Sequence, residues 1–296
     1  MTSPVLHAEG LTKRYGRRLA LSDCTLSVPP GRVVGLVGPN GAGKTTLLQL
    51  AVGMLTPTAG TIRVVGGRPA SGAAQLARVG FVAQDAPTYA GLSIKDHLRF
   101  AARTNRRWDQ RMAEDRVAAL GLDPGQRVGR LSGGQRAQIA LTLAIAKCPE
   151  LLVLDEPVAA LDPMARREFL RALAAYTAEN RTSVIHSSHL VSDLERVCDY
   201  LVVLVASRVR LAGDVGELLA GHHRLTGTRR DAADLPAGVQ VVEANHTACQ
   251  STFVVRGDTP VNDPSLTVEP LSLEDLVLAY MSQAVTSSRP DLEATR

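Results

Sequence analysis

Short apolar runs alternate with helical patterns along the first two thirds of the chain. The runs at 33–37, 61–65, 79–84, 151–154 and 200–205 have the length and composition of strands. Strands that alternate with helices favour a mostly parallel sheet with helices on both faces. We therefore predict an α/β fold.

The first strands follow a different pattern. Residues 4–9 and 24–28 alternate apolar and polar positions, which predicts two short strands, with 11–16 lying between them. We expect this region to form an antiparallel β part beside the parallel sheet.

Helical patterns dominate from about residue 85 to 148. Ser93 and Asp96 resemble a helix cap, a helix fits 109–120, and another begins near Ser132. Because this stretch interrupts the alternation of strands and helices, we predict a helical subdomain inserted in a domain that spans residues 1–213.

The signals weaken beyond Gly213. Residues 239–244 and 252–256 predict a pair of strands, and 271–281 predicts a helix. We expect residues 214–281 to form a small α+β accessory region and the polar end, 282–296, to be a disordered tail. His222 and His223 have no motif around them and are expected to be solvated.

Composition narrows the possible partners. The 296 residues are 45% hydrophobic and 21% charged, which is an ordinary globular balance. The net charge of +4 is small and evenly spread, so we expect no nucleic acid partner. The longest apolar run, 201–206, is far below the ~18 residues that span a bilayer, so a membrane-spanning part would belong to another chain.

A phosphate-binding loop follows the strand at 33–37. Residues 38–46 fit the pattern G-x-x-x-x-G-K-[ST] without a mismatch: Gly38, Pro39, Asn40, Gly41, Ala42, Gly43, Lys44, Thr45 and Thr46. Backbone N–H groups of such a turn and the following helix N-terminus attract phosphate. Lys44 would reach the β- and γ-phosphates and Thr45 would bind Mg²⁺, which makes a turn that binds nothing the minor alternative.

Two acidic residues close the strand at 151–154. Asp155 is placed to hold Mg²⁺ beside the phosphate loop, and Glu156 to accept a proton from attacking water. The alternative is a pair of solvated acids, which the buried lead-in strand disfavours.

A second anion site is predicted where a helix opens with Ser132, Gly133, Gly134 and Gln135. One nucleotide rarely needs two γ-phosphate cradles. The pair makes sense if two chains meet head to tail and share their nucleotides.

Taken in order, these motifs resemble the ATP-binding subunit of an ATP-binding cassette (ABC) transporter, over residues 4–213. By this resemblance the fold is a P-loop NTPase core. Gln84 is similar to the glutamine that contacts Mg²⁺ and marks the permease groove, and Asp162 to the D-loop aspartate. His189 is similar to the switch histidine, and Tyr15 to the aromatic residue that stacks on adenine.

The resemblance implies a mechanism and partners. ATP with Mg²⁺ binds one subunit, the 132–135 segment of a second subunit closes over it, and Glu156 and His189 support hydrolysis. The implied partners are that second subunit, identical or not, and a transmembrane permease, with the chain peripheral on the cytoplasmic membrane face.

The segment 271–276 is similar to a short motif of drug and multidrug exporters, which favours export. The alternative is a soluble ABC ATPase that acts on ribosomes or DNA. The single compact cassette, without heptads or cysteine pairs, disfavours it. The presence of Glu156 and His189 disfavours a regulatory module that does not hydrolyse ATP.

Overall fold

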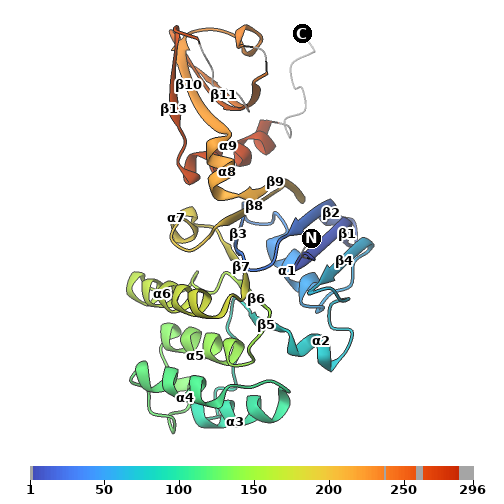
Figure 1. Ribbon diagram of the computed structural model, residues 1–296, viewed down its shortest axis with the longest axis vertical. Helices are drawn as coiled ribbons and strands as arrows, with labels where there is room; N and C mark the ends of the chain where they lie inside the picture. Colours follow the sequence, from blue (N-terminus) through green and yellow to red (C-terminus); the bar gives the residue numbers. More distant parts are fainter. Residues whose placement is uncertain (1–2, 237, 258–262, 287–296) are drawn as a thin grey trace.

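The computed structural model describes residues 3–236, 238–257 and 263–286. An elongated molecule is built around a six-stranded sheet at its middle (Figure 1). In spatial order the strands are β5 (Val79–Val82), β6 (Leu151–Asp155), β7 (Ser183–Ser188), β3 (Val33–Val37), β8 (Tyr200–Val205) and β9 (Arg208–Asp214). The first five run parallel and β9 is antiparallel to β8, so the predicted mostly parallel sheet is confirmed.

Helices cover both faces of this sheet. They are α1 (Lys44–Ala51) on one face, and α5 (Gly133–Ile145) and α6 (Pro163–Asn180) on the other. Every residue of β6 is buried, which is why its sequence is an unbroken apolar run rather than an alternating one. The acidic residue that ends β6 is thereby held at the carboxyl edge of the sheet.

A three-stranded antiparallel sheet lies beside the main sheet, in the order β2-β1-β4. Its strands are β1 (Leu6–Tyr15), β2 (Arg18–Val28) and β4 (Ala59–Val64). The expectation that residues 11–16 lie between two short strands was wrong, because β1 continues to Tyr15. The pairing of β1 with β2 shifts register after Ala8 and again after Leu11 and Lys13. Such bulges interrupt the two-residue alternation from which strands are predicted.

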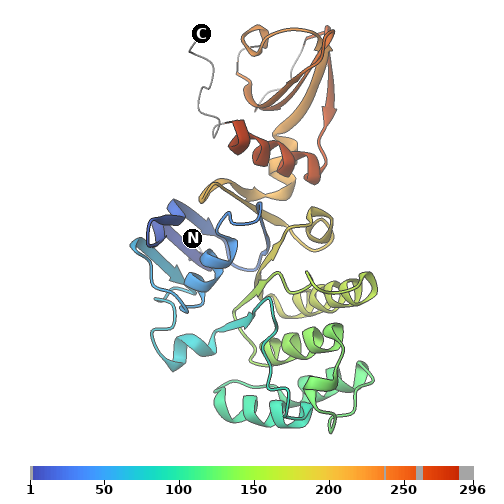
Figure 2. The same cartoon turned by 180° about the vertical axis from the view of Figure 1, so that it is seen from behind.

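The helical subdomain lies at one end of the long axis (Figures 1 and 2). Its elements are α3 (Ile94–Thr104), α4 (Gln110–Ala119) and the short η1 (Val128–Arg130); α2 (Ala73–Ala77) precedes β5. Ser93 and Asp96 form the predicted capping box at the start of α3. The subdomain has its own apolar cluster, in which Ile94, Val117 and Ile139 are buried.

The C-terminal region lies at the opposite end of the long axis (Figure 1). After α7 (Val191–Leu194) and β9, it consists of α8 (Val215–Ala220), β10 (His222–Thr228), η2 (Ala232–Asp234), β11 (Gln240–His246), β12 (Gln250–Arg256), β13 (Leu266–Pro270) and α9 (Leu273–Thr286). Its strands lie in the order β11-β12-β10-β13, and β11 pairs with β12 as predicted.

Helix α9 joins this region to the main sheet. Leu276 and Val277 of α9 are fully buried in one cluster with Val203 and Val205 of β8. The helix continues to Thr286, so a tail that begins at residue 282 was wrong; residues 287–296 lie outside the described part.

His222 is buried, with 1% of its surface exposed, which corrects the expectation of a solvated side chain. Its Nδ1 lies 2.6 Å from the Leu218 carbonyl oxygen and its Nε2 lies 2.9 Å from the Tyr280 hydroxyl. Burial lowers the pKa of His222. The partner on α9 is 58 residues away in sequence, which is why no local pattern predicts this contact.

Candidate functional site

The loop after β3 has the backbone that a phosphate cradle needs. Gly43, the residue directly before α1, has a φ of 108°. A Cβ atom at Gly43 would collide with the carbonyl oxygen of Ala20, so only glycine fits. The loop therefore turns sharply into α1, whose amino end faces the cavity.

Lys44 lies inside this loop with only 5% of its surface exposed. Its Nζ donates to the carbonyl oxygen of Gly38 at 2.8 Å and to that of Pro39 at 3.4 Å. It also lies 3.5 Å from Oε1 of Glu156. The cation is thus held at the centre of the loop, facing the carboxylate that ends the neighbouring strand.

Asp155 and Thr45 meet across the carboxyl edge of the sheet. The Thr45 hydroxyl donates to Oδ1 of Asp155 at 3.2 Å, and the Ser187 hydroxyl lies 3.0 Å from the same oxygen. Burial raises the pKa of Asp155, while the bonds from Ser187 and Thr45 oppose the shift. Sequence reasoning missed Ser187; the signal was a polar run, Ser187–His189, at the end of an apolar strand.

Glu156 lies between a lysine and a histidine. Its Oε2 is 3.3 Å from Nδ1 of His189, and its backbone N–H donates to the Ser187 hydroxyl at 2.8 Å. Its φ is 44°, a left-handed conformation that is strained for a residue with a side chain. The turn aims the carboxylate back over the phosphate loop instead of continuing the strand.

A cavity of about 680 Å³ opens above these groups. Its lining includes Tyr15, Gln84, Glu156 and His189, which sequence reasoning had singled out separately. Tyr15 is 45% exposed, so its ring is free to stack on a flat ligand. Arg18, which follows Tyr15 across the β1–β2 turn, also lines the cavity and was not predicted.

Comparison with known proteins identifies the family. The family described as "ABC transporter" matches residues 21–159. The Nod factor export ATP-binding protein I of Rhizobium johnstonii is 34% identical over 215 residues, 70% of this chain and 68% of the relative. The chain belongs to the ABC transporter family. It is the ATP-binding, ATP-hydrolysing subunit of a transporter, as the shared cassette and its motifs require.

Two further comparisons extend this assignment. The bacitracin transport ATP-binding protein BcrA of Enterococcus faecalis is 28% identical over 292 residues, 98% of this chain and 94% of the relative. This similarity to another ABC protein thus includes the C-terminal region. A solved ATP-binding subunit of an ABC transporter superposes with a TM-score of 0.65 at 27% identity, over 73% of this chain and 92% of that one.

The segment 132–135, which the sequence predicts as the second anion site, lies apart from the cavity. Ser132 caps α5, with its hydroxyl accepting from the backbone N–H of Gln135 at 3.2 Å and the Gln135 side chain accepting from the N–H of Ser132. Ser132, Gly133 and Gln135 are exposed and none of them lines the cavity. Asp162 caps α6 through the N–H groups of Met164 and Ala165.

The described part of the chain contains no helix that combines the length and the apolar character needed to cross a membrane.

Proposed function

We propose that this chain hydrolyses ATP as a head-to-tail dimer and thereby drives export through a separate membrane permease. The relative named for Nod factor export supports the outward direction. Because the permease would hold the membrane-spanning part, we place the chain on the cytoplasmic face of the membrane.

One observation supports the proposed dimer. Lys44, Glu156 and His189 lie together at the cavity, whereas the signature that begins at Ser132 is exposed elsewhere. Because residues 132–135 do not line the cavity of their own chain, the exposed amino end of α5 would meet the phosphates of a bound nucleotide from a second subunit. A second copy related by a two-fold axis would complete two such sites at once.

The residues around Asp155 fit Mg²⁺. Thr45, Asp155 and Gln84 offer a hydroxyl, a carboxylate and an amide, which are the oxygen ligands that this ion prefers. When bound there with ATP, the ion would neutralise charge on the phosphates. Lys44 would bind the same phosphates through its ammonium group.

Glu156 is the proposed base and His189 its partner at the γ-phosphate. The strained turn at Glu156 and its contact with His189 hold the carboxylate at the cavity. A general base contributes ~10²–10⁴ in rate. Tyr15 would stack on the adenine, and the rest of the loop from Gly38 to Thr46 would surround the phosphates.

A groove beside Gln84 supports permease docking. This cavity of about 510 Å³ is lined by apolar side chains from the main sheet and from α3. Tyr89 and Phe100 at its rim are 65% and 55% exposed. Exposed apolar surface of this kind marks an interaction site, and we assign it to the permease.

We further propose that the chain divides as its motifs suggest. Residues 1–213 would form the ATP-binding domain, with the helical subdomain of 85–148 inserted in it, and 214–281 the accessory region. The end of β9 at Asp214 and the separate sheet that follows support this division.

The test is the Glu156→Gln variant of the full chain. Loss of the base should lower phosphate release by at least ~10². Since ATP is then not consumed, it should hold the protein as a dimer in light scattering with ATP and Mg²⁺, but not with ADP. Lys44→Ala should remain monomeric in either nucleotide, because it lacks the ammonium group that binds the phosphates.

Ser132→Arg separates the two halves of the proposed site. Its monomer should bind ATP as the wild type does, because Ser132 lies outside the cavity lining. Its turnover should fall by at least ~10², because a bulky cation blocks closure. Loss of ATP binding in this monomer, or wild-type turnover by Glu156→Gln, would contradict the proposal.

A further inference from the structure

A second large cavity, of about 630 Å³, lies at the opposite edge of the main sheet from the phosphate loop. Its lining includes Gly31, Arg78, Glu150 and Ser183, which precede or begin β3, β5, β6 and β7. Because these strands run parallel, their amino ends share the edge that faces away from the ATP cavity. The two cavities are therefore separate sites.

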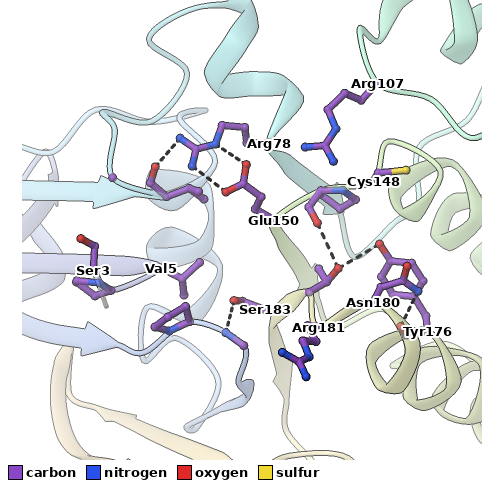
Figure 3. A pocket seen from close by; sticks show the side chains of 17 residues that line it. Ser3, Val5, Arg78, Arg107, Cys148, Glu150, Tyr176, Asn180, Arg181 and Ser183 are labelled. Carbon is purple, nitrogen blue, oxygen red and sulfur yellow. Dashed lines mark hydrogen bonds and ion pairs between the residues drawn. The ribbon is translucent and has the colours of Figure 1, made fainter. Parts of the chain in front are cut away.

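Three parts of the molecule meet in this amino-edge cavity (Figure 3). Val5 directly precedes β1 of the antiparallel sheet, Arg107 and Cys148 come from the helical subdomain, and Tyr176 and Arg181 come from α6 and its end. A molecule bound there would touch all three parts at once.

The charge of the lining is unbalanced. It contains Arg78, Arg107 and Arg181 against Glu150, a net charge of +2. Arg78 is fully engaged, since it binds both carboxylate oxygens of Glu150, at 2.7 and 2.8 Å, and the carbonyl oxygen of Val65. Glu150 is thus already neutralised.

Arg107 and Arg181 are the uncommitted cations. Within the described ranges neither side chain has a hydrogen bond or an ion pair. In Figure 3 the Arg107 guanidinium points toward the space between Glu150 and Cys148. The hydrogen bond from Arg78 is the main cause of the lowered pKa of Glu150, and the positive charge of Arg107 adds to it; Arg107 also opposes the rise that burial and Asp109 cause in the pKa of Cys148. Arg107 therefore acts on the interior of the cavity.

The cavity also has a buried polar wall. Tyr176 and Thr182 are 7% and 6% exposed, and the Thr182 hydroxyl lies 3.3 Å from both the Tyr176 hydroxyl and the Pro149 carbonyl oxygen. Burial raises the pKa of Tyr176, so the phenol keeps a proton that it can donate. Two free guanidinium groups and a hydroxyl donor suit an anion with several oxygens.

We propose that the amino-edge cavity is a second ligand site, which binds a small molecule that bears phosphate or carboxylate groups. Arg107 and Arg181 hold its charge, and the wall at Tyr176 offers a hydroxyl. Since Arg107 belongs to the helical subdomain and Arg181 to the end of α6, the bound anion fixes these two parts relative to each other. The site does not depend on ATP hydrolysis or on a permease.

Cys148 lines the cavity and makes its occupancy measurable. The wild-type chain is saturated with Mg-ADP to occupy the phosphate loop, and alkylation is followed for each cysteine by peptide mass spectrometry. Pyrophosphate and citrate, added separately, are the probes. We expect at least one to slow alkylation of Cys148 by ~10-fold or more, while the exposed Cys249 reacts at an unchanged rate and serves as the internal reference.

Glutamine variants test the assigned cations. Arg107→Gln and Arg181→Gln should each weaken the protecting anion by ~10- to ~100-fold, the usual range for a hydrogen bond to a charged group. The matched controls, Arg106→Gln and Arg171→Gln, remove exposed cations that do not line the cavity and should bind as the wild type does. Calorimetry under the same conditions gives the affinities independently of cysteine reactivity.

The outcomes are decisive in both directions. Protection by pyrophosphate alone assigns a phosphate ligand, and protection by citrate alone a carboxylate ligand. If neither anion binds at 10 mM, or if the control variants lose as much affinity as Arg107→Gln and Arg181→Gln, the proposal is wrong. Neither result depends on ATPase activity, so the proposed transport function stands or falls separately.

Discussion

Ser187 contacts both acidic groups of the site, through the Asp155 carboxylate and the backbone N–H of Glu156. It is a positioning residue, because it acts through these two acids. Ser187→Ala should lower kcat by ~10-fold, the equivalent of one hydrogen bond of about 1.4 kcal/mol, with little change in KM for ATP. Ser188→Ala is the matched control, since within the described residues its hydroxyl binds only the Leu190 backbone.

Ser187→Ala should also shift the pH profile of kcat. The bond from Ser187 lowers the pKa of Asp155 against the larger effect of burial. Without it the pKa rises further, so the carboxylate is lost at a higher pH and the acid limb of kcat moves upward. An acid limb at the wild-type position would show that Ser187 supports only the local fold.

His186, in the middle of the sheet, lowers the stability of the folded protein by an amount that depends on pH. It is fully buried in β7, and neither ring nitrogen has a partner within the part of the chain that the structure describes. Burial lowers its pKa from 6.5 to about 4. Between these values the unfolded chain binds more protons than the native one, so stability falls as the pH drops.

His186→Leu should therefore stabilise the protein. We expect the free energy of unfolding to rise by ~1–3 kcal/mol at pH 7.5, because two unsatisfied polar atoms are removed. At pH 5 it should rise by a further ~2 kcal/mol, because the variant no longer has the buried imidazole that protons destabilise. Urea unfolding at both pH values measures the difference.

At the scale of elements, the same capping box begins α3 and α5. Ser93 and Ser132 each accept from the N–H three residues on, at 3.1 and 3.2 Å. Replacing either by alanine should cost about 1 kcal/mol in free energy of unfolding. Only Ser132→Ala should also suppress ATP turnover, because only this cap is proposed to meet a phosphate of another subunit.

Ser93→Ala is thus the control for stability. Both variants are compared by thermal unfolding and by phosphate release from the isolated chain. Equal losses of turnover in the two variants would mean that Ser132 matters for its helix and not for a shared nucleotide.

The motifs and the elements that hold them were predictable because their chemistry is local. A glycine turn, a capping serine or an acid after an apolar strand is visible within about ten residues. The bulges of β1 could not be predicted, since they change which face of the sheet the following side chains lie on without changing the composition. Ser187 and His222 were missed because their partners lie 32 and 58 residues away in sequence.

At the scale of the whole molecule, α9 makes the C-terminal region part of the main core. Leu276 is fully buried against the cluster that includes β8. Leu276→Ala should cost ~2–5 kcal/mol and lower a single unfolding transition, because the cavity that it leaves lies in the shared core. Leu278→Ala, on the same helix but 54% exposed, should change stability by less than ~0.5 kcal/mol.

Calorimetry and the fluorescence of Trp108, the single tryptophan, are used together to follow the unfolding transition of the Leu276→Ala variant. Trp108 lies in the helical subdomain, at the far end of the molecule, so its signal should follow the calorimetric transition (Figure 1). A calorimetric transition at lower temperature that leaves the Trp108 fluorescence unchanged would show that the C-terminal region unfolds alone.

The position of α9 also matters while the chain is being made. The ribosome completes β8 at Val205 but does not reach the start of α9 at Leu273 until it has added another 68 residues. At about 5–20 residues per second this interval lasts roughly 3–14 s. During this interval the nascent chain exposes an apolar face of β8 that α9 will later cover. Newly made molecules should therefore depend on chaperones until α9 has been made, more than a cassette that ends at β9 would.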